Sequence, residues 1–580
     1  MIKTLLKSVR EYKSKSIITI ILTASEVILE CIIPFVMAML IDSIEKESIA
    51  TLFAYGFTLI LLAFASLYCG VMAGRCAASA ACGFAKNLRH DLYYSIQDYG
   101  FEDVDKFSQS SLVTRLTTDV SNTQMAYQMC MRIVIRVPLM IIFSFIMSLT
   151  INAKLSLIFI GLLPVIGFVL IMLVKVVSPL FQRVFKKYDN LNNSVQENVS
   201  GIRVVKAFSR EDFEKEKFNE AAKDVRDSFT KAERLVALNS PIMNICIYTA
   251  TLLVSFLGAK VIINTMGSEL SPGRLSSLIN YGVQILSSLM MVSMIFVMLS
   301  MAGTSAKRIC EVIEHEVSLT SPIEGIKEVK DGSIVFENVS FKYSKEASKY
   351  ALSDIDLTIK SGETVGIIGA TGSSKSTLVQ LIPRLFDVSE GKVMVGNVNV
   401  KDYNLETLRN EVAMVLQKNV LFSGTVKENL RWGNKEASDE ELVRVCKLAQ
   451  ADEFVSKFSE GYDTYIEQGG TNVSGGQKQR LCIARALLKK PKILILDDST
   501  SAVDTKTDAL IRKAFKQEIP DTTKIIIAQR ISSIQDADKI VILEGGKIAG
   551  VGKHDELLKD NEIYKEVYYS QIKSSKKGSE

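Results

Sequence analysis

Six long and nearly uncharged apolar runs occupy the first half of the 580-residue chain, and they constrain its fold more than any other feature. In lipid every backbone polar group must be satisfied within the protein, so a spanning segment of this length is a helix. Each run has about the 20 residues that an α-helix needs to cross a bilayer. We therefore predict six membrane-spanning helices, at residues 17–41, 51–73, 133–151, 155–174, 242–263 and 275–301.

The segments between these spans differ in length and charge. Residues 42–50, 152–154 and 264–274 are short and hold few Lys or Arg, whereas 75–132 and 175–237 are long and basic. The positive-inside rule places the long segments and both termini in the cytoplasm.

The long segments also have helical patterns, so we expect helices of about 25 residues that rise almost 40 Å from the membrane. Their tips, at 101–105 and 208–214, would contact whatever domain lies below; the alternative is two soluble hairpins with no mechanical role. The candidate coupling residues at these tips are Phe101, Glu102, Asp103, Phe208, Arg210 and Glu211.

Two pairs of ionisable residues interrupt the apolar runs at a spacing of one helical turn. Glu26 and Glu30 lie in the first span, and Arg132 and Arg136 lie near the start of the third. They either face a cavity, where acidic groups would bind a cationic substrate or protons, or have a structural role, in which they neutralise one another or snorkel to an interface. We favour the structural role and keep the substrate cavity as the alternative.

Composition excludes several classes of function. A net charge of +5 is explained by the basic loops and gives no case for nucleic acid as a partner. The nine cysteines are scattered without the pair spacing of a metal site. A chain of this length exceeds one ordinary core, so at least two domains are expected.

A glycine-containing loop in the second half, at residues 369–377, lies between a predicted strand and a predicted helix. Residues 365–368 read as a buried strand, and a helical pattern begins at Lys375. A flexible loop that ends on a helix N-terminus presents backbone N–H groups to phosphate. Lys375 would reach the outer phosphates, and the Ser376 hydroxyl would hold Mg²⁺. The nucleotide-binding residues predicted here are Gly369, Ala370, Thr371, Gly372, Ser373, Ser374, Lys375, Ser376 and Thr377.

Ser374 departs from the P-loop pattern, which has Gly before the lysine. A Cβ at a position where backbone and phosphate approach closely would strain the loop or alter the pocket. Upstream, Tyr343 ends an alternating strand-like run, and we predict that it stacks on adenine.

Further motifs follow the P-loop in order. Gln417 lies in Val-Leu-Gln-Lys, and Ser474-Gly475-Gly476-Gln477 opens a helix whose N-terminus is fit to hold a γ-phosphate. Asp497 ends the buried strand 493–497 and suits a Mg²⁺ ligand that acts through water. Residues 501–504 read Ser-Ala-Val-Asp and end on Asp504.

With these motifs the chain resembles a half-size ATP-binding cassette (ABC) exporter along nearly its whole length. The resemblance implies an all-α transmembrane domain of the type IV exporter fold at 1–310, a linker at 311–331, an α/β P-loop nucleotide-binding domain at 332–573 and a basic tail at 574–580. It implies ATP and Mg²⁺ as cofactors, with Gln417 on the metal. It also implies that Ser474, Gly475, Gly476, Gln477 and Asp504 contact ATP that is held by a partner domain.

Two further positions differ from the motif residues of the family that the chain resembles, and both affect the hydrolysis of ATP. The general base after Asp497 should be Glu and is Asp498, which is one methylene shorter, and the switch histidine is replaced by Gln529. Because a small displacement of a base is costly to catalysis, the sequence predicts a site that binds ATP but hydrolyses it poorly.

The intact signature beside an impaired site resembles the degenerate subunit of a heterodimeric bacterial multidrug-type exporter. The resemblance implies a second, different ABC half-transporter as partner, amphipathic drugs or lipids as substrates, and the plasma membrane, with the cassette in the cytoplasm. An active homodimer that tolerates both substitutions is one alternative, as a lipid or peptide exporter or flippase. An ATP-gated module that does not transport is another.

Overall fold

The chain forms two compact units in the computed structural model, which describes residues 1–44, 49–344, 347–499 and 502–577. The helical unit comprises Met1–Gln97 and Gln109–His315, and the cassette unit comprises Asp98–Ser108 and Glu316–Glu580. The predicted two-domain architecture, all-α followed by α/β, is confirmed. The short segment Asp98–Ser108 belongs by its contacts to the cassette unit, although it lies within the first half of the chain.

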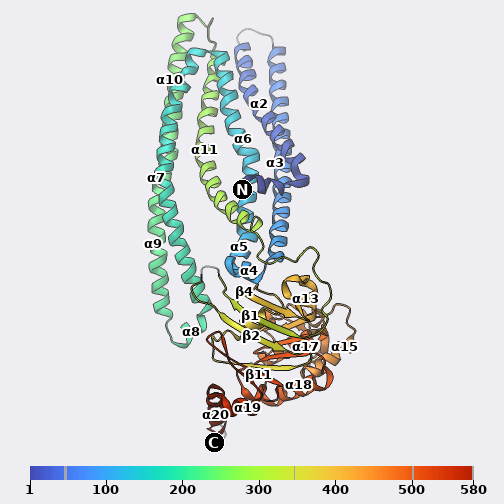
Figure 1. The fold of residues 1–580 in the computed structure, drawn as a ribbon. Coiled ribbons are helices and arrows are strands. Elements are labelled where there is room, and N and C mark those ends of the chain that lie inside the picture. The colour runs from blue at the N-terminus through green and yellow to red at the C-terminus, as the bar shows by residue number, and fades with distance from the viewer. Residues whose placement is uncertain (45–48, 345–346, 500–501, 578–580) are drawn as a thin grey trace. The chain divides into compact units, whose positions relative to one another are not determined.

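Long helices that run roughly side by side make up the helical unit (Figure 1). The N-terminal helix α1 (Ile2–Lys7) precedes them, and α5 (Gln109–Thr114) continues through a π-helical turn at Arg115–Asp119 into the third long helix. The long helices are α2 (Lys13–Ser43), α3 (Ile49–Asp98), α6 (Val120–Ile151), α7 (Ala153–Ser200), α9 (Glu211–Ala237), α10 (Asn239–Thr265) and α11 (Pro272–Ile313).

The helices extend well beyond the apolar runs. At 1.5 Å per residue, α3 is about 75 Å long, and its predicted span 51–73 is only its first half. Among the described residues, five stretches are long and apolar enough to cross a membrane: Arg10–Ser43, Ile49–Asp98, Gln109–Ile151, Glu211–Thr265 and Pro272–Val292. The predicted span 155–174 lies in α7, where several side chains are outside the described set.

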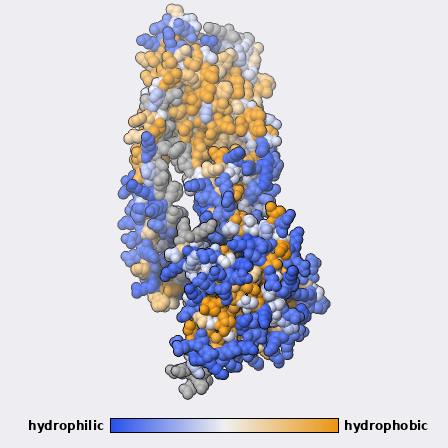
Figure 2. Space-filling model, viewed as in Figure 1, coloured by the Kyte–Doolittle hydropathy of each residue, from blue (hydrophilic) through white to orange (hydrophobic). Residues whose placement is uncertain are grey.

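Hydrophobic residues gather on one end of this bundle, and the far ends of α7 and α9 are largely hydrophilic (Figure 2). These two helices pack against each other and are joined by the short helix α8 (Ile202–Ala207). The predicted cytoplasmic extension at 175–237 is therefore a helical hairpin with α8 at its tip.

Two large sheets organise the described part of the cassette unit, beside a small two-stranded one formed by β7 (Gly424–Thr425) and β8 (Tyr465–Ile466). The larger has the strand order β12-β11-β3-β10-β9-β6, and all its pairings are parallel except β11 with β12. The smaller is antiparallel, with the order β2-β1-β4-β5. The larger sheet comprises β3 (Thr364–Ile368), β6 (Val412–Val415), β9 (Ile493–Asp497), β10 (Thr523–Ile527), β11 (Lys539–Glu544) and β12 (Lys547–Gly552). The smaller comprises β1 (Ile334–Phe341), β2 (Leu352–Ile359), β4 (Glu390–Val395) and β5 (Val398–Asn399).

Helices cover the central strands on both faces, and those strands are mainly apolar and fully buried. Every residue of β9 and β10 is buried, in keeping with a parallel sheet that is shielded on both sides. The main covering helices are α12 (Lys375–Gln380), α15 (Asp439–Leu448), α17 (Gly475–Leu488), α18 (Thr505–Glu518), α19 (His554–Asp560) and α20 (Glu562–Lys577). Because β3, β10 and β9 are parallel neighbours, the loops at their carboxyl ends meet at one edge.

The domain boundaries can now be compared with the structure. Helix α11 continues to Ile313, and the helical unit ends at His315 rather than at residue 310. The predicted tail begins inside α20, which continues to Lys577. In both places the helix continues into the charged segment that follows the predicted boundary.

Candidate functional site

The predicted P-loop connects the carboxyl end of β3 to the N-terminus of α12. A Cβ on Gly369 would collide with the backbone carbonyl of Leu543, and Gly372 has a φ of +84°, so both positions need glycine. Ser374 has a φ of +69° in the left-handed region. The serine thus keeps the backbone of the glycine it replaces.

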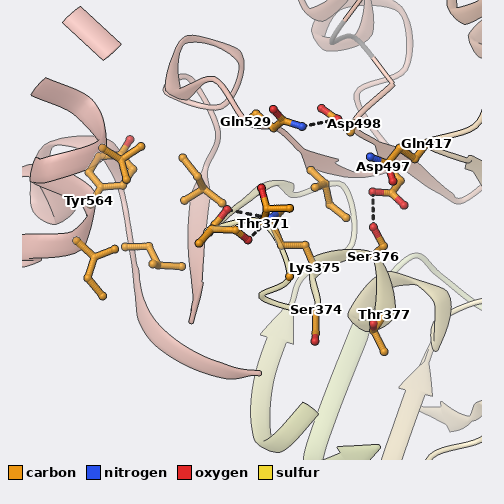
Figure 3. Close-up of a pocket in the computed structure, with 18 residues that line it drawn as sticks. Thr371, Ser374, Lys375, Ser376, Thr377, Gln417, Asp497, Asp498, Gln529 and Tyr564 are labelled. Atoms are coloured by element: carbon orange, nitrogen blue, oxygen red, sulfur yellow. Dashed lines mark hydrogen bonds between the residues drawn. The ribbon is translucent and has the colours of Figure 1, made fainter. Parts of the chain in front are cut away.

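Lys375 holds the loop through its ammonium group. Its Nζ donates to the carbonyl oxygens of Gly369, at 2.8 Å, and Ala370, at 2.9 Å (Figure 3). Burial lowers the pKa of Lys375, while the nearby Asp498 and Asp497 carboxylates oppose that shift. The ammonium is therefore poised beside the place where the loop's backbone would surround a triphosphate.

The predicted metal ligands come together at the end of β9. Ser376 Oγ donates to Asp497 Oδ1 at 2.9 Å, and Gln417 lines the same cavity. A hydroxyl, a carboxylate and an amide oxygen form the hard oxygen donor set that Mg²⁺ prefers beside phosphates, so these residues fit the ion. Burial raises the pKa of Asp497, and the adjacent Asp498 adds to the rise. A cation here would relieve that penalty.

Asp498 and Gln529, two of the three positions that depart from the expected pattern, are joined by a hydrogen bond. Gln529 follows β10, and its Nε2 donates to Asp498 Oδ2 at 2.8 Å (Figure 3). Asp498 has a left-handed φ of +48°, and its N–H donates to the carbonyl of Ile527. Burial raises the pKa of Asp498, and the Gln529 amide partly offsets the rise. The carboxylate is thus held by a neutral amide that cannot accept a proton.

A cavity of about 540 Å³ joins these groups. The loops of the large sheet form one wall, and Ile563, Tyr564 and Val567 of α20 form another. Sequence reasoning missed this second wall because the three residues follow the P-loop by almost two hundred positions and carry no nucleotide-binding motif.

Tyr343, the residue predicted to stack on adenine, lies at the flank of the P-loop. Its hydroxyl is 2.7 Å from Thr377 Oγ1, and its ring packs edge-on against Phe386. Its side chain is about half exposed, at 48%. Among the described residues it does not line the cavity, so stacking on adenine stays a prediction.

The signature residues form a well-capped helix N-terminus. Ser474 Oγ accepts from the Gln477 N–H, and Gln477 Oε1 accepts from the Ser474 N–H at 2.8 Å, which is a capping box on α17. Gly475 is exposed, and a Cβ on Gly476 would approach the Ala502 carbonyl at 2.8 Å. The N–H groups of a helix N-terminus suit an anion, so this terminus could hold one.

Asp504 begins α18 as its N-cap and accepts from the Thr507 N–H at 3.0 Å. Ser501, which precedes it in the predicted motif, lies outside the described residues. The Asp504 carboxylate therefore caps its own helix, and the rest of this side chain is exposed.

The first predicted tip is a helix, α4 (Phe101–Phe107), within the cassette unit. Asp103 is 3% exposed, and its Oδ2 accepts from the N–H groups of Gly100 and Ser318 and from the Ser318 hydroxyl. Phe101 packs edge-on against Phe386, the ring that also contacts Tyr343. Glu102 is exposed.

The second predicted tip lies in the helical unit, where α8 turns into α9. Phe208 is 73% exposed there, and Arg210 is the N-cap of α9. Glu211 pairs with Lys206 at 3.0 Å. This tip presents apolar surface without a covering element among the described residues of its own unit.

The four ionisable residues of the spans form one network between α2 and α6. Arg136 donates to Glu26 Oε1 and to both oxygens of Glu30 at 2.7 Å, and Arg132 lies 3.8 Å from Glu26. Two carboxylates thus face two guanidinium groups. This is the arrangement expected of pairs that neutralise each other, although a role toward substrate stays untested.

Comparisons with known proteins cover nearly the whole chain. A family model of the ABC transporter transmembrane region matches residues 16–302, and a model described as ABC transporter matches residues 352–501. The ABC transporter ATP-binding protein YfiB of Bacillus subtilis is 36% identical over 577 residues, which is 99% of each chain. The related protein YknU of the same bacterium is 35% identical over 84% of this chain and 83% of its own.

One solved structure extends the comparison to the fold. A bacterial Atm1-family ABC exporter with ATP bound superposes with a TM-score of 0.80 at 22% sequence identity, covering 97% of this chain and 98% of its own. The predicted exporter fold of the transmembrane helices is thereby confirmed.

Proposed function

Because the chain belongs to the ABC transporter family, with its transmembrane and nucleotide-binding domains in one polypeptide, we propose that it is the degenerate half of a heterodimeric exporter. Its partner is a different ABC half-transporter that supplies the catalytic Glu and His. The complex moves amphipathic drugs or lipids out across the plasma membrane. The cassette and both termini lie in the cytoplasm.

The observation that carries this proposal is the bond between Gln529 and Asp498, at 2.8 Å. A general base must take a proton from water, and its usual helper at this position is an imidazole. Here a short carboxylate is tied to an amide that neither accepts a proton nor carries charge. Hydrolysis therefore slows at the site where this chain's own P-loop holds the triphosphate.

The phosphate-binding residues retain the means to bind nucleotide. Lys375 and the loop N–H groups hold the phosphates, and Ser376, Asp497 and Gln417 hold Mg²⁺, which when bound neutralises charge on the phosphate oxygens. ATP at this site acts as a persistent link between the two cassettes. Ser474 and Gly475 meanwhile complete the site that the partner's P-loop forms, where hydrolysis resets the cycle.

The two tips transmit cassette closure to the spans. Asp103 caps α4 through the Gly100 N–H and joins the helix to this chain's own cassette through Ser318. The exposed Phe208 end of the second hairpin is the surface available to the partner's cassette. A groove lined by Leu416, Phe422 and Trp432 in this cassette would receive the corresponding hairpin of the partner.

Isolation from native membranes followed by transport tests the proposal. The tagged chain should co-purify with one different ABC half-transporter, and inside-out vesicles that contain both should concentrate an amphipathic dye only with Mg-ATP. A purely self-paired chain that transports would contradict the heterodimer. Ion current without concentrative uptake would contradict export and favour a gated channel.

A further inference from the structure

The C-terminal helix α20 is fixed against the nucleotide cavity near its start. Tyr564 is 1% exposed and lines the cavity (Figure 3). Its hydroxyl is 2.7 Å from His554 Nδ1 of α19. Ile563 and Val567 line the cavity beside it. The position of α20 is therefore set by packing before the helix reaches its last turns.

Gln571 lies about two turns further along α20 and binds the backbone of the switch loop, residues 528–531 after β10. Its Oε1 accepts from the Ile531 N–H at 2.9 Å, and its Nε2 donates to the Gln529 carbonyl at 2.8 Å. Arg530, between them, is extended, with φ −99° and ψ 128°. In an extended strand the carbonyl before a residue and the N–H after it point to the same side, so one primary amide satisfies both, as a neighbouring strand would.

The switch loop carries Gln529, whose side chain donates to Asp498. The Ala528 N–H donates to the Ile367 carbonyl, which anchors the loop at the end of β10, and Gln571 anchors it on the far side of Gln529. The Gln529 amide is thus held between two fixed points when it donates to Asp498. Motion of α20 would move that amide directly.

We propose that Gln571 is a positioning residue for this site: through the switch-loop backbone it keeps Gln529 on Asp498, and so sets how long the site retains Mg-ATP. The inference rests on the proposed function in one respect, since it takes nucleotide retention as the output of this site. The alternative is that Gln571 only stabilises the packing of α20.

The test uses Gln571→Met, which keeps the size and helix propensity of the side chain and removes both hydrogen bonds. Gln571→Glu, which keeps the acceptor and loses the donor, is the second variant. The matched control is Glu566→Gln, an exposed acid-to-amide exchange on the same helix. Dissociation of a fluorescent ATP analogue with Mg²⁺ is followed in the full-length complex, in single variants and in combination with Gln529→Ala.

We expect Gln571→Met to speed the slow phase of dissociation about tenfold, given two lost hydrogen bonds, and Gln571→Glu to act in the same direction. The control should leave the rate unchanged. In the Gln529→Ala background the effect of Gln571→Met should largely vanish, because both changes act through one loop.

Additive effects in that cycle would overturn the inference, since a purely structural role does not depend on the Gln529 side chain. So would an unchanged rate in Gln571→Met. If the wild-type chain hydrolyses ATP quickly, the proposed function is wrong whatever the role of Gln571. The double-mutant cycle of Gln571→Met and Gln529→Ala is then repeated with kcat and KM of ATP hydrolysis as the measured quantities. Coupling in kcat would preserve the positioning role, and additivity there would remove it.

Discussion

Ser374 adopts a backbone conformation that L-residues rarely occupy, at the point where the P-loop enters α12. A left-handed residue other than glycine costs roughly 1–2 kcal/mol. The fold nevertheless keeps this geometry, so the N–H groups of the loop stay aimed at the cavity. This conformational strain lies in the P-loop, the segment that would also bind phosphate.

Replacing this serine tests that cost. We predict that Ser374→Gly tightens Mg-ATP binding about twofold to fivefold, because part of the roughly 1 kcal/mol of strain no longer opposes the bound loop. Binding of a fluorescent ATP analogue to the full-length chain measures this. Asn397→Gly, a turn position with a φ of +63°, removes similar strain far from the P-loop and should leave affinity unchanged. Equal or weaker binding in Ser374→Gly would contradict the prediction.

Asp497 and Asp498 are adjacent carboxylates, and each has its pKa raised mainly by burial. Their raised pKa values mean that both groups hold protons to higher pH than a solvated carboxyl does. Since a metal ligand must be deprotonated, Mg-ATP binding weakens as pH falls through the raised pKa of Asp497.

Asp498→Asn removes the neighbouring negative charge but leaves an oxygen for the Gln529 amide. The pKa of Asp497 should fall, so the acid limb of Mg-ATP binding should move to lower pH. Titration of binding affinity against pH measures the shift. Asp536→Asn, an exposed carboxylate paired with Arg512, should not move it. A shift of the acid limb to higher pH would show that the Asp498 charge does not raise the pKa of Asp497.

At the scale of single elements, α3 passes close to the charge network of the spans. A Cβ on Gly70 would lie 2.8 Å from Glu26 Oε1, the oxygen that Arg136 already binds. Glu26 is 8% exposed, so it has little room to withdraw. Breaking a buried pair leaves an uncompensated charge, which is strongly destabilising.

Gly70→Ala should therefore destabilise the helical unit by about 1–3 kcal/mol despite the gain in helix propensity. Thermal unfolding of the full chain in detergent measures it. Gly56→Ala is the matched control on α3, since nothing lies within 4 Å of its Cβ, and it should be neutral or stabilising. If the two variants unfold alike, Glu26 is not confined by α3.

The docking of α4 is a second element-scale property. Asp103 accepts three hydrogen bonds, two of them from Ser318 at the start of the cassette part of the chain. The Phe101 ring continues this contact to Phe386 and, through it, to Tyr343 beside Thr377. A single buried carboxylate thus fixes the helix that leads toward the P-loop flank.

Asp103→Ala should uncouple transport from ATP use. We expect dye transport by the complex to fall about tenfold or more, while Mg-ATP affinity stays within a factor of about two, because a helix cap and buried hydrogen bonds are lost far from the phosphates. Transport and binding are measured on the same preparation. Glu102→Ala, an exposed neighbour, should retain both. Parallel loss of binding and transport in Asp103→Ala would indicate a folding defect instead.

The sequence could supply the elements whose signal is local. A strand, a glycine-rich loop and Lys375 identify a phosphate site within a dozen residues, and uncharged runs identify spans. Three other contacts join positions far apart in the chain. Tyr564 lines the cavity, Gln571 binds the switch-loop backbone, and Asp103 accepts hydrogen bonds from Ser318. Such pairs follow from packing, which a periodic pattern does not encode.

At the scale of the whole molecule, the chain keeps the residues that bind a triphosphate and offers a well-formed helix terminus to a neighbour. Asp498 and Gln529 lie together and share a hydrogen bond. Under the proposed function, these two substitutions make the site retain ATP, and the signature of this chain serves the site of the partner.

Steady-state ATP hydrolysis by the purified full-length chain tests this account most directly. The chain without its partner should turn over ATP close to background, and Asp498→Glu combined with Gln529→His should raise the rate by about a hundredfold or more, the usual contribution of a well-placed general base. A wild-type chain that hydrolyses ATP by itself as fast as the doubly substituted one would contradict the division of labour proposed above.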